Sequence, residues 1–256
     1  MAAARATTLR EMVASGIRDA IASGTYPPDA RIPPEETLVA QYGVSRETVR
    51  RALDTLTAEG LITAGQGRAG RNVQRHDPMT VHVTRTESRG RADERATAGA
   101  DAWSADVTDL GHVPGQAITV AIEDATPDMA ARLEIEPGAP VVIRRHLRTI
   151  DGVASNFSDT YYDAKLAEGT AIMHPADITE GVIAYMRDKM GIHQVWFTVE
   201  FGARMPTPEE SRQLRIPPGI PVLTEHRTGY DPKRPVKVTV TIWPAHKVRL
   251  LCEFPG

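Results

Sequence analysis

Apolar residues in the first part of the chain recur at three- and four-residue spacing, which is the period of a helix with one buried face. Three segments show this pattern: Leu9, Met12, Val13, Ile17, Ala20 and Ile21; then Leu38, Val39 and Tyr42; then Val49, Ala52, Leu53 and Leu56. Gly24 follows the first segment as a helix C-cap would, and Pro34 can occupy the first helical position of the second. The pattern therefore predicts three helices around one core.

A tight turn is expected between the second and third helices. Gly43 supplies the turn, and Ser45 can accept a hydrogen bond from a backbone N–H at the start of the third helix. Arg46 and Arg50 then lie one helical turn apart and project together, away from the apolar stripe. Taken alone, such arginines usually do no more than solvate an exposed helix face.

The neighbouring segments favour a recognition role over plain solvation. In a helix-turn-helix, the N-terminal end of the second helix meets base edges in the major groove, where arginine can contact guanine through two hydrogen bonds. Thr48 can reach a phosphate or a thymine methyl group. After the third helix, Glu59 to Ile62 leads into the glycine-rich Gly65 to Gly70, which is typical of a small hairpin. These parts predict a winged helix-turn-helix that reads double-stranded DNA.

The glycine-rich hairpin also fits the dinucleotide-binding pattern Gly-x-Gly-x-x-Gly. That pattern holds pyrophosphate only when a strand comes before it and a helix begins at its end. Here only Leu61-Ile62-Thr63 comes before it, and a polar segment that ends in Pro78 follows. A nucleotide site is therefore not expected, and no cofactor is predicted.

Residues from about 13 to 73 resemble the N-terminal domain of the GntR family of bacterial transcription regulators. The family motifs are matched by Ile21 to Gly24, by an arginine and Pro-x-Glu stretch at Arg31 to Glu35, by Val44 to Leu53 and by Glu59 to Leu61. The resemblance implies that the DNA contacts come from Arg31, Ser45, Arg46, Thr48 and Arg50, and from a wing that enters the minor groove around Gly67 and Arg68. Two positions depart from the family. Glu36 stands where a basic residue often contacts phosphate, and Ala69 makes the wing one residue longer.

The second half of the chain contains an internal repeat. Thr126-Pro127-Asp128, Leu133-x-Ile135-x-Pro137-Gly138 and Pro140-Val141 recur as Thr207-Pro208-Glu209, Leu214-x-Ile216-x-Pro218-Gly219 and Pro221-Val222. Each copy predicts a short helix with a threonine cap, then a Pro-Gly turn and a strand that turns back as a hairpin. We expect an antiparallel sheet with helices on one face, and a further helix from Thr179 to Met190 that Gly191 ends.

This half, from about Trp103 to Phe254, resembles the UTRA ligand-sensing domain of the HutC branch of the GntR family, whose fold is similar to chorismate lyase. The resemblance implies homodimers that bind small molecules between the sheet and the helices. The expected fold class is α+β. Residues 1–75 form the winged helix-turn-helix DNA-binding domain, residues 76–100 form a charged linker, and residues 101–256 form the chorismate-lyase-like antiparallel sheet with helices, for effector binding and dimerisation.

Carrying the family pattern onto this chain implies effector contacts from Trp103, Ser104, His146, Arg148, Ser158, Lys237 and Trp243. Gly181-Val182-Ile183 replaces the Ser-x-Tyr of members that bind sugar phosphates, which argues against an amino-sugar phosphate. Arg148 with Lys237 suits an anionic ligand, while the two tryptophans suit a flat or apolar one. Alternatively, the tryptophans are core residues, and Arg148 pairs with a carboxylate.

Composition and charge limit the remaining possibilities. The chain has 256 residues, of which 41% are hydrophobic, and shows neither a membrane span nor the apolar core of a signal peptide, so cytoplasm is expected. The single Cys252 excludes an intramolecular disulfide framework, and no residues have the spacing of a catalytic or metal site. The net charge is −3, but residues 1–75 contain ten Arg and eight Asp or Glu, a balance of +2. This mild balance predicts DNA affinity from placed arginines and dimerisation more than from a broad basic field.

The sequence thus predicts a cytoplasmic, homodimeric transcription regulator, a repressor that binds a pseudo-palindromic operator in double-stranded DNA and responds to a small-molecule effector. The alternative is a small-molecule binding or lyase-like protein whose winged helix serves only as a protein-interaction module. Only the regulator predicts salt-dependent, sequence-specific binding of duplex DNA.

Overall fold

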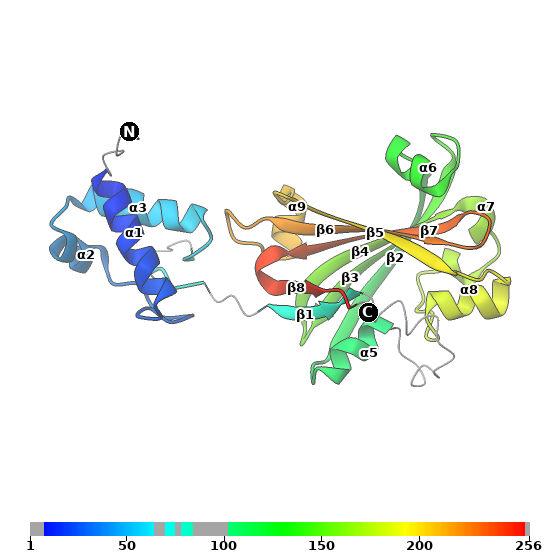
Figure 1. Cartoon of the computed structure of the whole chain (residues 1–256), viewed down its shortest axis with the longest axis horizontal. Coiled ribbons are helices and arrows are strands. Elements are labelled where there is room, and N and C mark those ends of the chain that lie inside the picture. The colour runs from blue at the N-terminus through cyan, green and yellow to red at the C-terminus, as the bar shows by residue number, and fades with distance from the viewer. Residues whose placement is uncertain (1–7, 64–69, 75–77, 84–101, 254–256) are drawn as a thin grey trace. The chain divides into compact units, whose positions relative to one another are not determined.

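The computed structural model describes residues 8–63, 70–74, 78–83 and 102–253, and Figure 1 labels the helices and strands. The chain divides into two compact units, residues 1–77 with 205–221 and residues 78–204 with 222–256. Within the described ranges, no helix combines the length and apolar character needed to cross a lipid bilayer.

The first unit begins with α1 (Leu9–Ala22), α2 (Glu35–Tyr42) and α3 (Arg46–Ala58), as the periodicity predicts. Gly43 ends α2 in the left-handed conformation at φ 63°, which confirms the expected turn. The position of Pro34 is wrong by one residue. Its ψ of 150° is extended, so it precedes α2 as the N-cap residue. Sequence alone does not separate the two positions, because proline fits the fixed φ and the missing N–H of either.

The wing begins as two paired arms. Ile62 and Val73 form an antiparallel bridge, and the Thr63 backbone N–H donates to the Asn72 carbonyl at 2.8 Å. The segment before α2 pairs with the second arm as well, because Arg31 forms an antiparallel bridge with Asn72. The described part of the predicted hairpin is therefore a small three-segment sheet beside α3.

One apolar core holds the three helices and the wing arms together. Its buried side chains are Val13, Ala14, Ile17, Ile32, Leu38, Val44, Val49, Ala52, Leu53, Leu56, Ile62 and Val73. The stripe of α3 is confirmed in full. At the start of α1 the stripe begins later than predicted, since Leu9 is 60% and Met12 is 40% exposed.

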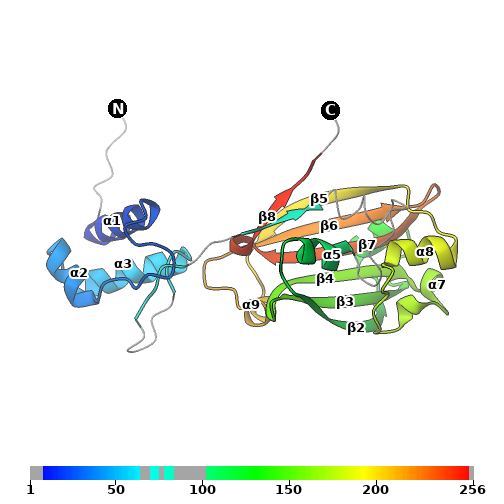
Figure 2. The ribbon, with the colours of Figure 1, turned by 90° about the horizontal axis from the view of Figure 1, so that it is seen from below.

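The second unit contains a six-stranded antiparallel sheet with the strand order β2-β3-β4-β7-β6-β5. Figure 2 shows the strands side by side in this order. They are β2 (Pro114–Asp124), β3 (Pro140–Ile150), β4 (Val153–Asp163), β5 (Trp196–Arg204), β6 (Val222–Tyr230) and β7 (Pro235–Pro244). The two predicted hairpins are β3 with β4 and β6 with β7, and they meet where β4 pairs with β7.

The helices of the repeat begin as predicted. Thr126 caps α6 (Pro127–Leu133) by accepting a hydrogen bond from the Met129 N–H at 3.3 Å. Thr207 caps α9 (Pro208–Gln213) and forms a capping box with Glu210. The repeated Thr-Pro motif therefore marks the same kind of helix start twice.

Helices cover both faces of the sheet, so the expectation of helices on one face is wrong. α6 packs against Val141 and Ile143, whereas α7 (Ala164–Ala167) and α8 (Val182–Met190) pack against Val142. Neighbouring residues on a strand point to opposite faces. The uninterrupted apolar run Val141-Val142-Ile143 is the sequence signal that both faces of the sheet are buried.

The segment assigned to the linker differs from the expectation near its start. Residues 79–82 form strand β1 (Met79–His82), which pairs in parallel with β8 (Val248–Leu251) far along the chain. α8 begins at Val182, three residues later than predicted, because Gly181 at φ 82° breaks the helical conformation. The remaining elements are α5 (Ala102–Asp109) and the short 3-10 helices η2 (Ala171–Met173) and η3 (Ala245–Lys247).

Candidate functional site

A serine cap fixes the first turn of α3. The Ser45 hydroxyl oxygen accepts a hydrogen bond from the Thr48 backbone N–H at 3.2 Å, and it lies 2.8 Å from the Thr48 hydroxyl. The cap satisfies a backbone N–H that has no acceptor within the helix. It also fixes the half-buried Thr48 side chain, one of the residues predicted to contact DNA.

Arg46 and Arg50 are exposed on the first two turns of α3. The Arg46 side chain is 71% exposed, and its Nε donates to Glu35 Oε2 at 2.7 Å. This hydrogen bond and the negative charge of Glu35 raise the pKa of Arg46 above its ordinary value. Sequence reasoning missed Glu35, which orients the Arg46 guanidinium from the start of α2 while leaving most of the side chain accessible.

Arg31 lies at the base of the wing. Its guanidinium is next to Gly70, where an added Cβ would come within 2.7 Å of the Arg31 Nε. Gly70 also has a φ of 72°, so both space and backbone conformation favour glycine there. Gly67 and Arg68, the expected minor-groove residues, lie outside the described residues.

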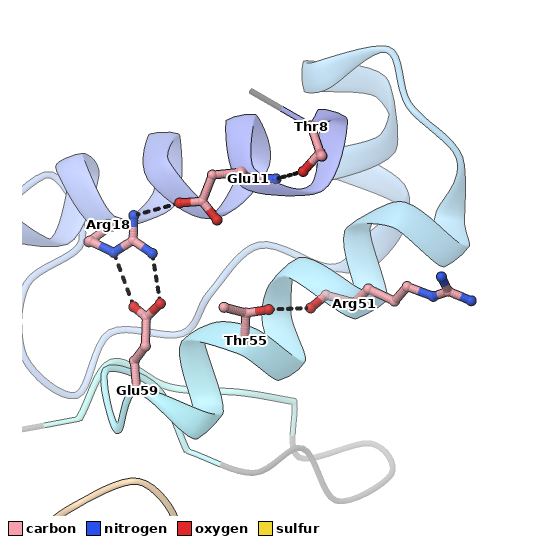
Figure 3. Close-up of polar contacts among 6 residues, drawn as sticks. All are labelled: Thr8, Glu11, Arg18, Arg51, Thr55 and Glu59. Carbon is pink, nitrogen blue, oxygen red and sulfur yellow. Dashed lines mark hydrogen bonds and ion pairs between the residues drawn. The ribbon is translucent and has the colours of Figure 1, made fainter. Parts of the chain in front are cut away.

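Ion pairs connect α3 to its support, and Figure 3 shows the one between Arg18 and Glu59. The Arg18 guanidinium of α1 donates to both carboxylate oxygens of Glu59, just after α3, at 3.0 and 2.8 Å. Arg71, at the base of the wing, donates to Asp54 of α3 at 2.6 Å. Exposed pairs of this kind add little stability. They link α3 to α1 and to the base of the wing, which the shared apolar core already packs together.

The cap residue allows stability and DNA binding to be separated. We expect Ser45→Ala to lower the free energy of unfolding of the first unit by about 0.5–2 kcal/mol, because the Thr48 N–H loses its acceptor. Ser45→Asp keeps a good cap but brings a carboxylate close to DNA phosphates. Denaturation and DNA titration of both variants test this: Ser45→Asp should retain stability and lose affinity. Parent-like DNA binding by Ser45→Asp would remove this end of α3 from the interface.

The second candidate site is one face of the six-stranded sheet. His146 pairs with Ser158, and Ser158 pairs with Thr241. Residues directly opposite in antiparallel strands point to the same face. The His146 Nδ1 lies 3.2 Å from the Ser158 carbonyl oxygen, and the hydroxyls of Ser158 and Thr241 are 3.4 Å apart. Two of the predicted effector residues are therefore neighbours in a polar row across three strands.

Arg148 follows this row on β3 and contacts α5. Its guanidinium carbon lies 4.6 Å from the centre of the Trp103 ring, which is a cation–π contact. Trp103 is only 8% exposed. Ser104 is half-buried, and its carbonyl accepts a hydrogen bond from the Thr108 hydroxyl at 2.8 Å. Trp103 also lines a cavity of about 110 Å³ between β1 and α5.

Trp243 and Lys237 lie at different ends of β7. Trp243 follows Ile242, which pairs with Phe157, so Trp243 lies at the same end of the sheet as Arg148. Lys237 is six residues earlier, roughly 20 Å along an extended strand. The expectation that Arg148 and Lys237 suit one small anion is therefore wrong, because the strand registers keep them apart.

Sequence reasoning missed three charged residues on this face, of which Arg144 and Glu225 are buried and Arg227 is half-buried. The Arg144 guanidinium donates to the carbonyls of Ile172 at 3.1 Å and Ala176 at 2.9 Å, and burial lowers its pKa. Glu225 and Arg227 form an ion pair on β6, with side chains 4% and 12% exposed. The sequence signal for these three residues is a charged residue at an alternate position of a strand that apolar residues flank.

Two family models match the chain. Residues 9–71 match the model described as "Bacterial regulatory proteins, gntR family", and residues 110–249, more than half of the chain, match the model of the UTRA domain. The chain belongs to the GntR family. As a GntR regulator with a UTRA domain, the protein combines a DNA-binding winged helix-turn-helix with an effector-binding domain, which confirms the α+β fold and the class of function that the sequence predicts.

Several relatives of this GntR protein match it over nearly its whole length. An HTH-type transcriptional regulator of Rhizobium meliloti (strain 1021) is 30% identical over 252 residues, which cover 96% of this chain and 94% of the relative. The histidine utilization repressor of Pseudomonas putida is 29% identical over 236 residues, covering 91% and 87%. A crystal structure of a GntR-family transcriptional regulator has a TM-score of 0.70 at 26% identity, covering 97% and 98%. PhnF from Mycobacterium smegmatis shares the fold, with a TM-score of 0.56 at 18% identity and coverage of 97% and 100%.

Proposed function

We propose that this GntR protein is a cytoplasmic, homodimeric repressor that binds a pseudo-palindromic operator and releases it when a small molecule occupies the UTRA domain. The observation that carries the proposal is the pair Arg46 and Arg50, exposed at the capped start of α3. Arginines at this end of a recognition helix reach guanine edges in the major groove. Arg31, Ser45, Thr48, Gly67 and Arg68 complete the proposed DNA contacts. The repressor role is supported by similarity to a histidine utilization repressor.

Dimerisation is assigned to the second unit. Its edge strand β5 exposes Trp196 at 48% and Phe201 at 49%, and Val195 just before it is 47% exposed. Large apolar groups along an unpaired strand edge favour association. A second copy of the chain would cover them and set the distance between the two recognition helices.

The proposed regulation acts through that distance. Two recognition helices bind two half-sites only when their separation matches a whole number of helical turns of DNA. A ligand that binds one dimer arrangement better than the other shifts the population toward it. The proposed effector residues are Trp103, Ser104, His146, Arg148, Ser158 and Trp243, without Lys237 at the far end of β7, and the function requires no catalytic step.

The experiment that tests this function combines two measurements on the full-length protein. Sedimentation should give a dimer, and fluorescence anisotropy should give tighter binding to duplexes with two inverted half-sites than with one. A monomer that binds one half-site as tightly as two would contradict the proposal. Trp196→Ser on the edge strand should weaken both dimerisation and two-site binding.

Replacing Glu36 by arginine is expected to increase the affinity of the protein for duplex DNA. It is exposed in the first turn of α2, where the family resemblance places a basic residue against phosphate. We expect Glu36→Arg to strengthen binding to all duplexes and to steepen the slope of log affinity against log salt by about 1. Glu136→Arg, the same charge change on an exposed site of the second unit, is the control. An unchanged salt slope in Glu36→Arg would place residue 36 away from DNA.

A further inference from the structure

Three buried polar atoms without a hydrogen-bond partner surround Arg148 in the second unit. They are Trp103 Nε1, Gln116 Oε1 and Asn156 Oδ1. Buried polar atoms in folded proteins almost always have a partner, because losing hydration without replacement is costly. Three such atoms around one cation suggest a site whose partner is a ligand.

The strand registers bring these groups together. Gln116 on β2 and Asn156 on β4 both pair directly with Arg148 on β3, so the three side chains project from the same face. Trp103 of α5 lies over the Arg148 guanidinium at 4.6 Å. Asn156 is 1% and Trp103 is 8% exposed. We call Trp103, Gln116, Arg148 and Asn156 the Arg148 cluster.

The Arg148 cluster offers both donors and acceptors. The Arg148 guanidinium and the Trp103 N–H can donate to the oxygens of an anion. The amide nitrogen of Asn156 donates to the Ser155 hydroxyl at 3.4 Å, and its carbonyl oxygen has no partner. The carbonyl oxygens of Asn156 and Gln116 therefore need donors from the ligand. An ammonium group has three N–H donors and can satisfy both, whereas a hydroxyl group has one O–H donor and can satisfy either.

We propose that the Arg148 cluster binds an α-hydroxy or α-amino carboxylate. Its carboxylate accepts hydrogen bonds from Arg148 and Trp103. An ammonium group beside the carboxylate donates to both Asn156 and Gln116, and a hydroxyl group in that place donates to one of them. Of the cluster residues, Trp103 also lines the cavity of about 110 Å³ between β1 and α5. This assignment rests on the proposed effector function of the second unit, and it adds Gln116 and Asn156 to the effector residues.

Glycolate and acetate are the matched probes, because they differ by one hydroxyl group beside the carboxylate. Titrations of the full-length protein, followed by tryptophan fluorescence at constant ionic strength, should give glycolate about fivefold tighter binding than acetate, the usual effect of one hydrogen bond. Inorganic phosphate should bind no better than acetate. Whichever of Asn156→Leu and Gln116→Leu removes the acceptor of the glycolate hydroxyl should abolish the preference for glycolate. Thr239→Val, a change of a polar residue on the same face outside the cluster, should keep it.

Equal binding of glycolate and acetate, tighter binding of phosphate, or a glycolate preference that persists in both leucine variants would overturn the assignment. Gln116 is half-buried on the edge strand β2, so Gln116→Leu should fold. Where Asn156→Leu does not fold, Asn156→Ala removes the same carbonyl oxygen with a smaller side chain. DNA titration of the same preparations without ligand keeps the two proposals separate. Normal DNA binding without a glycolate preference refutes only the ligand class, and a glycolate preference without DNA binding refutes only the DNA-binding function.

Discussion

Arg46→Ala is expected to weaken binding to the preferred operator by about fivefold to 150-fold and to relax discrimination at one base pair in each half-site. The reason is the loss of a two-bond contact with a base from an exposed guanidinium that Glu35 orients at 2.7 Å. Anisotropy titrations at fixed salt measure the effect on the parent operator and on operators with single base changes. The largest loss should fall on the operator that the parent prefers.

Arg51→Ala is the matched control for this variant. Arg51 is an equally exposed arginine of α3, 68% exposed and paired with Glu47 at 2.9 Å. It lies five residues after Arg46, roughly 140° around the helix axis, so it does not face the same groove. Its loss should reduce affinity for all duplexes by the same small factor. Equal loss of base discrimination in both variants would contradict the assignment of Arg46 to a base contact.

Leu56→Ala is expected to lower the free energy of unfolding of the first unit by about 2–5 kcal/mol, the cost of a cavity at a fully buried leucine. Leu56 is 0% exposed and belongs to the stripe that packs α3 into the core. A loss of this size removes much of the stability of a small domain, so operator binding should fall with it. Chemical denaturation and DNA titration at increasing temperature measure the two effects together.

Leu9→Ala is the matched control for the core. Leu9 lies at the start of α1 and is 60% exposed, so its truncation should change the free energy of unfolding by no more than about 0.5 kcal/mol. Equal destabilisation by Leu9→Ala and Leu56→Ala would mean that the stripe of α3 is not the core of this unit.

The first unit could be predicted well because its signals are local. Helical periodicity, the Ser45 cap and the left-handed Gly43 each depend on residues only a few positions apart. The ion pair between Glu35 and Arg46 was beyond that reasoning, because it joins two helices across the turn. Its geometry depends on how α2 and α3 cross, which periodicity does not give.

The second unit was predicted less completely because its contacts join distant residues. The repeat identified both hairpins, but β2 and β5, which precede α6 and α9, were not expected. The pairing of Gln116 and Asn156 with Arg148 depends on strand register, and a shift by one residue would turn each side chain to the opposite face. For the same reason, the separation of Arg148 from Lys237 appears only in the folded sheet.

Selection of bound duplexes from a random pool by the full-length protein shows whether two recognition helices read DNA together. Two recognition helices that read DNA as a pair predict enrichment of an inverted repeat, with half-sites a fixed number of helical turns apart and an affinity that falls steadily with salt. A pool that shows no enriched sequence, or a single half-site without its inverted partner, would contradict the account.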